Sequence, residues 1–261
     1  MTTLERTIAR DRLWTTAGLV TMTLLAWAWL VREAARMNGM AAEAHMHIAM
    51  GMADMRVWDA AAWLGLFMMW SIMMVAMMLP SAAPLIVLVL GTYRRRNTAQ
   101  ARLSAYAFLG GYLCAWTAFS AVAALAQVVM HRGAVMSPDM RVASSVIASV
   151  VLIAAGVYQW LPIKNMCLSH CRSPLGFMMS DWREGIAGAF AMGLRYAAWC
   201  VVCCWLVMAV LFVAGAMSIA WAIAISLYVL LERLLPLGRR FDRAMGAALV
   251  ALGLWRLVVP A

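Results

Sequence analysis

Soft metal ligands are concentrated in one short stretch of this chain, residues 37–55. His45 and His47 lie there with Met46 and Met50, and four further methionines complete the set: Met37, Met40, Met52 and Met55. Thioether sulfur is a soft ligand and imidazole a borderline one, so this mixture favours copper, and Cu(I) above all, over Mg²⁺, Ca²⁺ or Zn²⁺. Because the stretch is a polar gap between two apolar runs, we predict a copper-capturing loop beside a membrane.

More methionines follow inside the apolar run of residues 60–90. Met73 and Met77 are four residues apart, so a helix presents both on one face, and a ladder of thioethers suits the passage of Cu(I) between sites. Pro80 and Pro84 free backbone carbonyls, which membrane helices tolerate where they line a cavity. The alternative is that these methionines only fill irregular space in the core.

Cysteines form a second group of soft ligands in the apolar run of residues 186–215. Cys200, Cys203 and Cys204 fall within five residues, and Met208 continues the same helical face one turn after Cys204. A lone buried cysteine is usually a small apolar residue. Three so close together favour a metal or redox role.

Two further cysteines lie between Pro162 and Pro174. Cys167 and Cys171 are four residues apart, so one helical turn presents both to a ligand, and His170 adds a nitrogen donor. The spacing does not match a zinc finger. A cytoplasmic position would keep the thiols reduced, which favours metal binding over a structural disulfide. The alternative is a turn with incidental thiols.

Glu232 lies near the end of the apolar run of residues 217–235. A carboxylate at membrane depth is costly and usually functional, but a local ion pair with Arg233, or exposure at the membrane interface, is a nearly equal alternative. Elsewhere, Gly110, Gly111 and the glycines of residues 185–193 favour close helix packing. We find no phosphate-binding glycine loop, no Ser/His/Asp set and no carboxylate pair placed for hydrolysis, so a non-enzymatic role is favoured.

The composition requires a membrane protein. Of 261 residues, 66% are hydrophobic and 12% charged, and several apolar runs exceed the length that crosses a bilayer. The mean hydropathy of +0.85 agrees with this. We therefore predict an all-α, polytopic transmembrane bundle. The net charge of +10 comes from basic clusters between the runs, where they face lipid headgroups, so nucleic acid is excluded as a partner.

About seven spans are expected, over residues 13–31, 60–90, 104–130, 142–162, 186–215, 217–235 and 244–259. The basic clusters place the N-terminus in the cytoplasm and the Met/His loop on the opposite side of the membrane. We expect this membrane to be a bacterial inner membrane. Residues 186–195 are either part of a long tilted helix or a separate interfacial piece. We divide the chain into residues 1–59, an N-terminal span with the loop, and residues 60–261, the bundle.

The chain resembles a family of predicted metal-binding integral membrane proteins without established activity. The resemblance covers about residues 60–260 and rests on these elements: Trp70 with Ala76 to Pro80; Tyr158, Gln159, Pro162, Lys164, Cys167, Cys171, Arg172 and Pro174; Cys203 to Trp205 with Met208; and Glu232 with Pro236. It implies metal binding and a functional role for Lys164. The spacing of Met73 and Met77 is also similar to the Met-x-x-x-Met element of eukaryotic copper importers, as an analogy only.

Copper transport or delivery is the leading hypothesis, with Cu(I) passing from the outer loop along the methionines to the cysteines. Zinc or another transition metal is the alternative cargo. The competing functions are a membrane redox enzyme that uses the cysteines or copper, and a subunit that holds metal for a membrane complex. An ordinary bundle without metal remains the simplest alternative. Besides lipid and metal, we expect a metallochaperone or membrane complex as partner.

Overall fold

The computed structural model describes residues 3–49, 60–96, 100–133, 136, 141–216, 218–235 and 238–259, but not the side chains of residues 3–8, 41–45, 47–49, 238 and 239. The described residues are almost entirely helical, as the apolar runs predict. The helices are α1 (Thr3–Ala49), α2 (Ala60–Arg95), α3 (Ala101–Arg132), α4 (Ser145–Tyr158), α5 (Pro162–Arg172), α6 (Pro174–Ser180), α7 (Gly185–Ala214), α8 (Ile219–Leu234) and α9 (Gly238–Val258).

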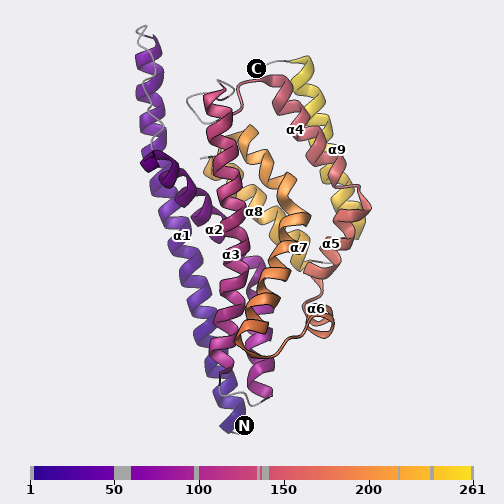
Figure 1. Ribbon diagram of the computed structural model, residues 1–261. Coiled ribbons are helices and arrows are strands. Elements are labelled where there is room, and N and C mark those ends of the chain that lie inside the picture. Colours follow the sequence, from indigo (N-terminus) through magenta and orange to yellow (C-terminus); the bar gives the residue numbers. More distant parts are fainter. Residues whose placement is uncertain are drawn as a thin grey trace.

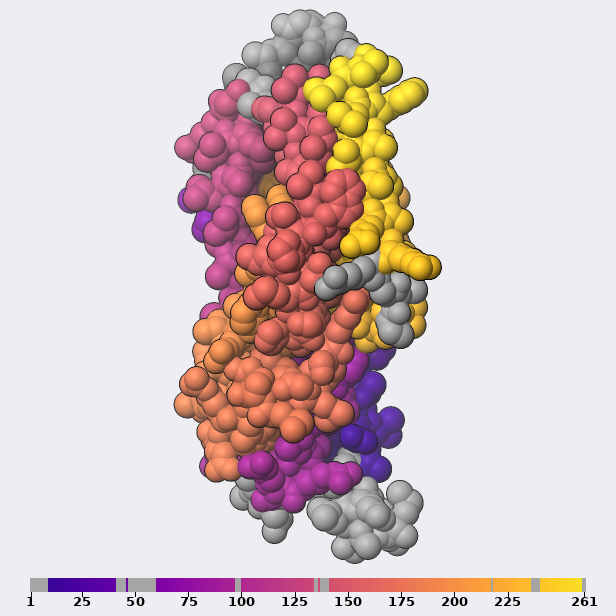
Figure 2. Space-filling model, turned by 90° about the vertical axis from the view of Figure 1, so that its right-hand side faces the viewer, coloured from indigo at the N-terminus to yellow at the C-terminus, as the bar shows by residue number. Residues whose placement is uncertain are grey.

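The helices form one elongated bundle (Figure 1). The central layer is made by α2, α3 and α7, with α8 packed against α2 and α7. On one side α1 lies along α2, and on the other α4 and α9 lie along each other, which Figure 2 shows as adjacent bands on one face. The start of α1 and the end of α9 are at opposite ends of the bundle.

Fewer helices than expected can cross a membrane. Among the helices of the described residues, four are long and apolar enough: α1 over Ala9–Met40, α2, α3 and α7. Helices α4 and α5 count as a fifth only if they form one broken span, since they meet at a bend of 65°. The prediction of seven spans is therefore wrong, because α8 has only 16 residues and α9 carries five charged residues. The protein is nonetheless all-α and multi-pass.

Helix α7 settles the question raised by residues 186–195. It runs without a break over Gly185–Ala214, 30 residues, so this piece is the first part of a long helix and not a separate segment. Arg195, which interrupts the apolar run, forms an ion pair with Asp181 at 2.9 Å. Two glycines with positive φ, Gly185 and Gly215, mark the two ends of the helix.

The prolines of α2 do free backbone carbonyls, as predicted, and one of these has a partner. Pro80 has no N–H to donate to the carbonyl of Ala76, one turn earlier. The indole N–H of Trp27 donates to that oxygen instead, at 3.1 Å, and joins α1 to α2. A buried carbonyl at membrane depth is thus satisfied by a neighbouring helix.

The Met/His stretch differs from the expected loop. Helix α1 continues to Ala49, so residues 37–49 are helical. The thioether of Met46 is largely exposed, and that of Met40 is partly so. The side chains of His45 and His47, and the whole of Met50, lie outside the described residues. The error arises because alanine, methionine and glutamate are all strong helix formers, which outweighed the polarity of the stretch.

Helices α3 and α7 lie side by side (Figure 1), and their backbones come very close at two glycines, Gly111 and Gly193. A Cβ on Gly193 would lie 1.9 Å from the carbonyl oxygen of Phe108, and a Cβ on Gly111 would lie 2.1 Å from that of Phe190. Each glycine thus admits the backbone of the other helix, the small-residue contact typical of membrane bundles. The predicted packing role is confirmed at these two positions.

We expect Gly193→Ala to destabilise the protein by about 1–3 kcal/mol, the usual cost of overpacking, because neither backbone can give way cheaply. Thermal unfolding in detergent measures this. Gly65→Ala in α2 is the control, since a Cβ on Gly65 would have no atom of another helix within 4 Å, and this variant should unfold at the wild-type temperature. Equal midpoints for the two variants would contradict a tight α3–α7 contact.

Candidate metal centre

Five of the six cysteines are buried in the bundle core, and we call Cys167, Cys171, Cys200, Cys203 and Cys204 the thiol cluster. The sixth, Cys114 on α3, is exposed. The Sγ atoms of Cys171 and Cys200 are 3.4 Å apart, although the residues come from different helices. The thiols of Cys203 and Cys204 both donate to the carbonyl oxygen of Cys200, at 3.2 and 2.9 Å. None of the five forms a disulfide.

The local sequence of α5 explains how its thiols reach the core. Pro162 at the first turn restarts the chain as a helix after the break that follows α4. The buried residues of α5 are Lys164, Cys167, Leu168 and Cys171, which follow the spacing of one helical face. That face lies against α7. Short as it is, α5 therefore buries both cysteines in the core and brings Cys171 to Cys200.

Arg233 is the one cation that contacts the thiol cluster in the described part of the chain. Its side chain is 5% exposed. Nη2 lies 3.6 Å from Sγ of Cys203 and 3.9 Å from Sγ of Cys204, and Nη1 donates to the hydroxyl of Ser81 at 2.8 Å. No carboxylate among the described residues is within ion-pair distance of it. A buried guanidinium without an anion is costly, so the cluster carries an uncompensated positive charge.

Glu232 has a different partner from the one that the sequence offers. Its carboxylate accepts from the ammonium of Lys164 and from the hydroxyl of Tyr228, the latter at 2.9 Å. Lys164 and Glu232 are both 1% exposed and form a closed ion pair. The local pairing of Glu232 with Arg233 is therefore wrong, because adjacent residues of a helix point about 100° apart. This pair neutralises itself and leaves Arg233 alone.

Other buried polar groups surround this ion pair. The side-chain oxygen of Gln159 accepts from Lys164 and, at 3.1 Å, from Tyr228. Arg172 donates through Nε to the backbone carbonyl of Glu232 at 2.7 Å, and its Nη2 lies 3.7 Å from the buried carboxylate of Asp242. The network fixes α5, α8 and α9 relative to one another.

The methionines of α2 are in the core, but no described contact joins the predicted pair to the thiols. Met73 and Met77 are each about 1% exposed. Met78 is linked to the thiol cluster through a chain of contacts: the hydroxyl of Tyr112 donates to its carbonyl, the ring of Tyr112 packs on Tyr196, and Tyr196 donates to the carbonyl of Cys171. Met208 is also fully buried, one turn beyond Cys204.

The ring of His170 contacts other groups than the thiols of Cys167 and Cys171, with which the sequence predicts that it shares a metal ion. Its ring stacks on Trp199 with centroids 4.7 Å apart, and Nδ1 lies 2.9 Å from the carbonyl oxygen of Met166. Adjacent residues of a helix point about 100° apart, so the spacing already separates His170 from Cys171, but it cannot show that His170 packs on Trp199 of α7. Among the described residues, no hydrogen bond connects His170 to a thiol.

The donor set suits a soft monovalent cation better than a four-coordinate one. Within the described residues, no three side chains of His, Cys, Asp or Glu are arranged as a metal site. The structure offers one close sulfur pair, Cys171 and Cys200, in an apolar setting. Thiolates select Cu(I), which is stable with few ligands, whereas structural Zn²⁺ takes four. The residues present therefore fit Cu(I) after a small rearrangement.

Arg233 and Ser81 are the residues that sequence analysis missed. From the sequence, Arg233 is expected only as an ion-pair partner of Glu232, and no role is expected for Ser81. One signal for Arg233 was available: an arginine in an apolar run whose sole acidic neighbour is adjacent must find its partner on another helix. Ser81 gave no signal, since its role depends on the contact between α2 and α8.

A family model described as PpoB2, copper chaperone, matches residues 67–256 of the chain. The matched stretch begins in α2 and ends in α9, so it contains the whole thiol cluster, Arg233 and the Lys164–Glu232 pair. All of α1, with the Met/His stretch, lies outside it. No curated protein and no solved structure is matched by the chain.

Proposed function

We propose that this chain, which belongs to the PpoB2 copper chaperone family, binds Cu(I) at Cys171 and Cys200 within the membrane bundle. It then delivers the ion to a partner protein. The observation that carries the proposal is the pair of thiols 3.4 Å apart from two different helices. Both sulfurs lie in the buried, mainly apolar core of the bundle. Copper is the cargo in this proposal, not a resident cofactor.

The charge of the site supports a monovalent cation bound by two thiolates. Two deprotonated cysteines contribute two negative charges, Cu(I) one positive charge and Arg233 another, so the loaded site is neutral. The same two thiolates with a divalent cation would leave a net positive charge in the core, which is unfavourable. The unpaired Arg233 is thus compensated when the thiols lose their protons and take the ion.

A redox role for the cysteines receives less support from the same geometry. Thiol–disulfide exchange requires a thiolate to attack a sulfur atom that it can reach. Cys171 is 4% exposed and Cys200 is fully buried, so a substrate disulfide has no access to either. The buried pair instead favours a small ion that can enter where a protein disulfide cannot.

The methionines of α2 and the Met/His stretch are assigned to copper entry in this proposal. Met46 at the exposed part of α1 is accessible to an ion from solution. Met73 and Met77 lie in the core of the bundle on α2, the helix against which α1 packs. Thioethers bind Cu(I) more weakly than thiolates do, so transfer from methionine to cysteine is downhill.

The central test is the double variant Cys171→Ser and Cys200→Ser in detergent-purified protein. Loss of a residue that only supports a metal ligand lowers metal affinity roughly 10- to 100-fold. The double variant removes both ligands, so we expect its Cu(I) affinity to fall by more than that. Anaerobic competition with a chromophoric Cu(I) chelator measures the affinity. Cys114→Ser is the matched control, because that thiol is exposed and remote from the cluster. Unchanged affinity in the double variant would refute the assignment.

Arg233→Met tests the charge argument through two effects of opposite sign. The variant should weaken Cu(I) binding about 10- to 100-fold. Metal-free protein should be as stable as wild type or more stable, by up to about 4 kcal/mol, because an uncompensated buried charge is removed. Chelator competition and thermal unfolding give the two readouts. A loss of stability in the metal-free protein would instead assign Arg233 a purely structural role through Ser81.

Replacing Met73 and Met77 together by leucine tests the entry route separately from the thiol pair. Leucine conserves volume, so we expect the fold to survive with a loss below about 1.5 kcal/mol. Cellular copper delivered to a partner should fall severalfold, while Cu(I) affinity of the purified protein stays unchanged. Met179→Leu, a largely exposed position on α6, is the control. Normal delivery by the double variant would remove the methionines from the route.

A further inference from the structure

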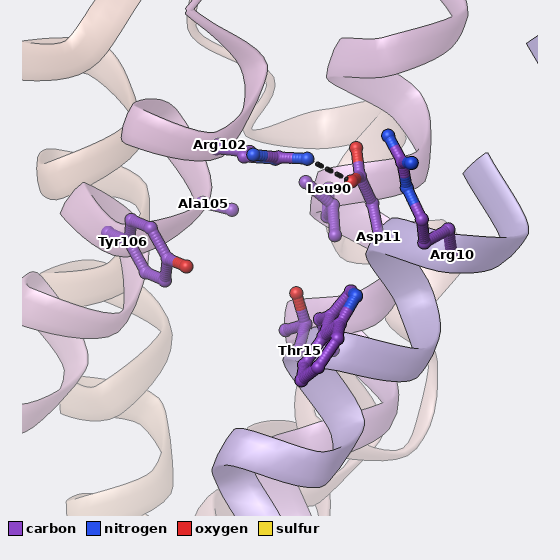
Figure 3. A pocket seen from close by; sticks show the side chains of 8 residues that line it. Arg10, Asp11, Thr15, Leu90, Arg102, Ala105 and Tyr106 are labelled. Atoms are coloured by element: carbon purple, nitrogen blue, oxygen red, sulfur yellow. Dashed lines mark hydrogen bonds and ion pairs between the residues drawn. The ribbon is translucent and has the colours of Figure 1, made fainter. Parts of the chain in front are cut away.

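A second chemically distinct region lies where α1, α2 and α3 meet at the end of the bundle where the chain begins. A cavity of about 520 Å³ opens between these helices, lined by Arg10, Asp11, Trp14, Thr15, Leu90, Arg102, Ala105 and Tyr106. Figure 3 shows Thr15 and Tyr106 on either side of the opening, with Arg102 reaching across to Asp11. The copper proposal uses none of these residues.

Positive charge exceeds negative charge at this cavity. Asp11 is 3% exposed and accepts from Arg102 at 2.6 Å, while its second carboxylate oxygen pairs with Arg94. Arg10, beside Asp11 in Figure 3, has no ion-pair partner among the described residues. Two guanidinium groups therefore share one carboxylate and Arg10 adds a third, so these described side chains carry two positive charges in excess. The Arg102 side chain is half exposed, so its remaining N–H groups are accessible.

The cavity is placed at the boundary of the membrane. The candidate spans of α1 and α3 begin at Ala9 and Ala101, and that of α2 ends at Arg95. All three boundaries are within a few residues of the cavity lining. Trp14 is 70% exposed and Tyr106 is 60% exposed. Exposed tryptophan and tyrosine at the ends of spans are typical of headgroup level, where the ring contacts acyl chains and the polar atom contacts water or phosphate.

From this combination we infer that the cavity binds the phosphate headgroup of an anionic glycerophospholipid. Arg10 and Arg102 bind the phosphate, since guanidinium groups match its oxygens with paired N–H donors. The hydroxyl groups of Thr15 and Tyr106 supply further hydrogen bonds, and Trp14 packs on the acyl chains. Basic pockets between membrane helices are known to favour anionic lipid headgroups in this way. The site is independent of copper.

The test uses full-length protein, stripped of lipid in detergent and titrated with dihexanoyl phosphatidylglycerol, dihexanoyl phosphatidylcholine or inorganic phosphate, with binding followed by native mass spectrometry. We expect phosphatidylglycerol to bind more tightly than the other two. Arg10→Gln should weaken it about fivefold, the ratio that corresponds to about 1 kcal/mol per arginine near an anionic surface. The variant breaks no described contact, so the fold is retained. Trp14→Leu is the second variant and should weaken the lipid but not phosphate.

Arg132→Gln is the matched control, at the other end of α3 and outside the cavity. It should leave phosphatidylglycerol binding unchanged. Equal effects of Arg10→Gln and Arg132→Gln would overturn the proposal, since the attraction would then be a general property of the basic surface. If inorganic phosphate bound as tightly as phosphatidylglycerol, the lipid proposal would also be overturned, and the cavity would be assigned to a free anion. Copper affinity stays at the wild-type value in Arg10→Gln, which separates this test from that of the thiol pair.

Discussion

The position of Arg233 constrains the rest of the structure. A guanidinium that has neither water nor a carboxylate beside it raises the energy of the core unless an anion forms there. The groups within reach that can become anionic are the thiols of Cys203 and Cys204, and through them the cluster that includes Cys171 and Cys200. Arg233 thus places a positive charge directly beside two thiols of the cluster in an apolar interior.

The bundle around this point meets the requirements of a buried charged site. The Lys164–Glu232 pair neutralises its own charges next to the cluster, so it does not compete for Arg233. Close contact of α3 and α7 through Gly111 and Gly193 keeps α7 in place. The break between α4 and α5 lets a short helix turn two cysteines inward. Together these features hold the five thiols in the core of the bundle.

Much of this protein was predictable from composition and spacing. The helical class follows because each apolar run is continuous and long, and only a helix satisfies its backbone in such a setting. Copper follows from the softness of methionine and cysteine, and the family match agrees with that choice of metal. The number of spans was overestimated because hydropathy does not distinguish a short core helix such as α8 from one that crosses the bilayer.

The sequence by itself determined which donors are available and which periodic faces carry them, because these depend on residue type and the helical repeat alone. Cys167 with Cys171, and Cys200 with Cys204, were each expected on one helix face for that reason. Only the tertiary structure decided that Cys171 meets Cys200, that His170 turns to Trp199 and that Glu232 pairs with Lys164 and not with Arg233. These outcomes depend on how helices distant in the chain are rotated about their axes, which is set by the packing of the whole bundle.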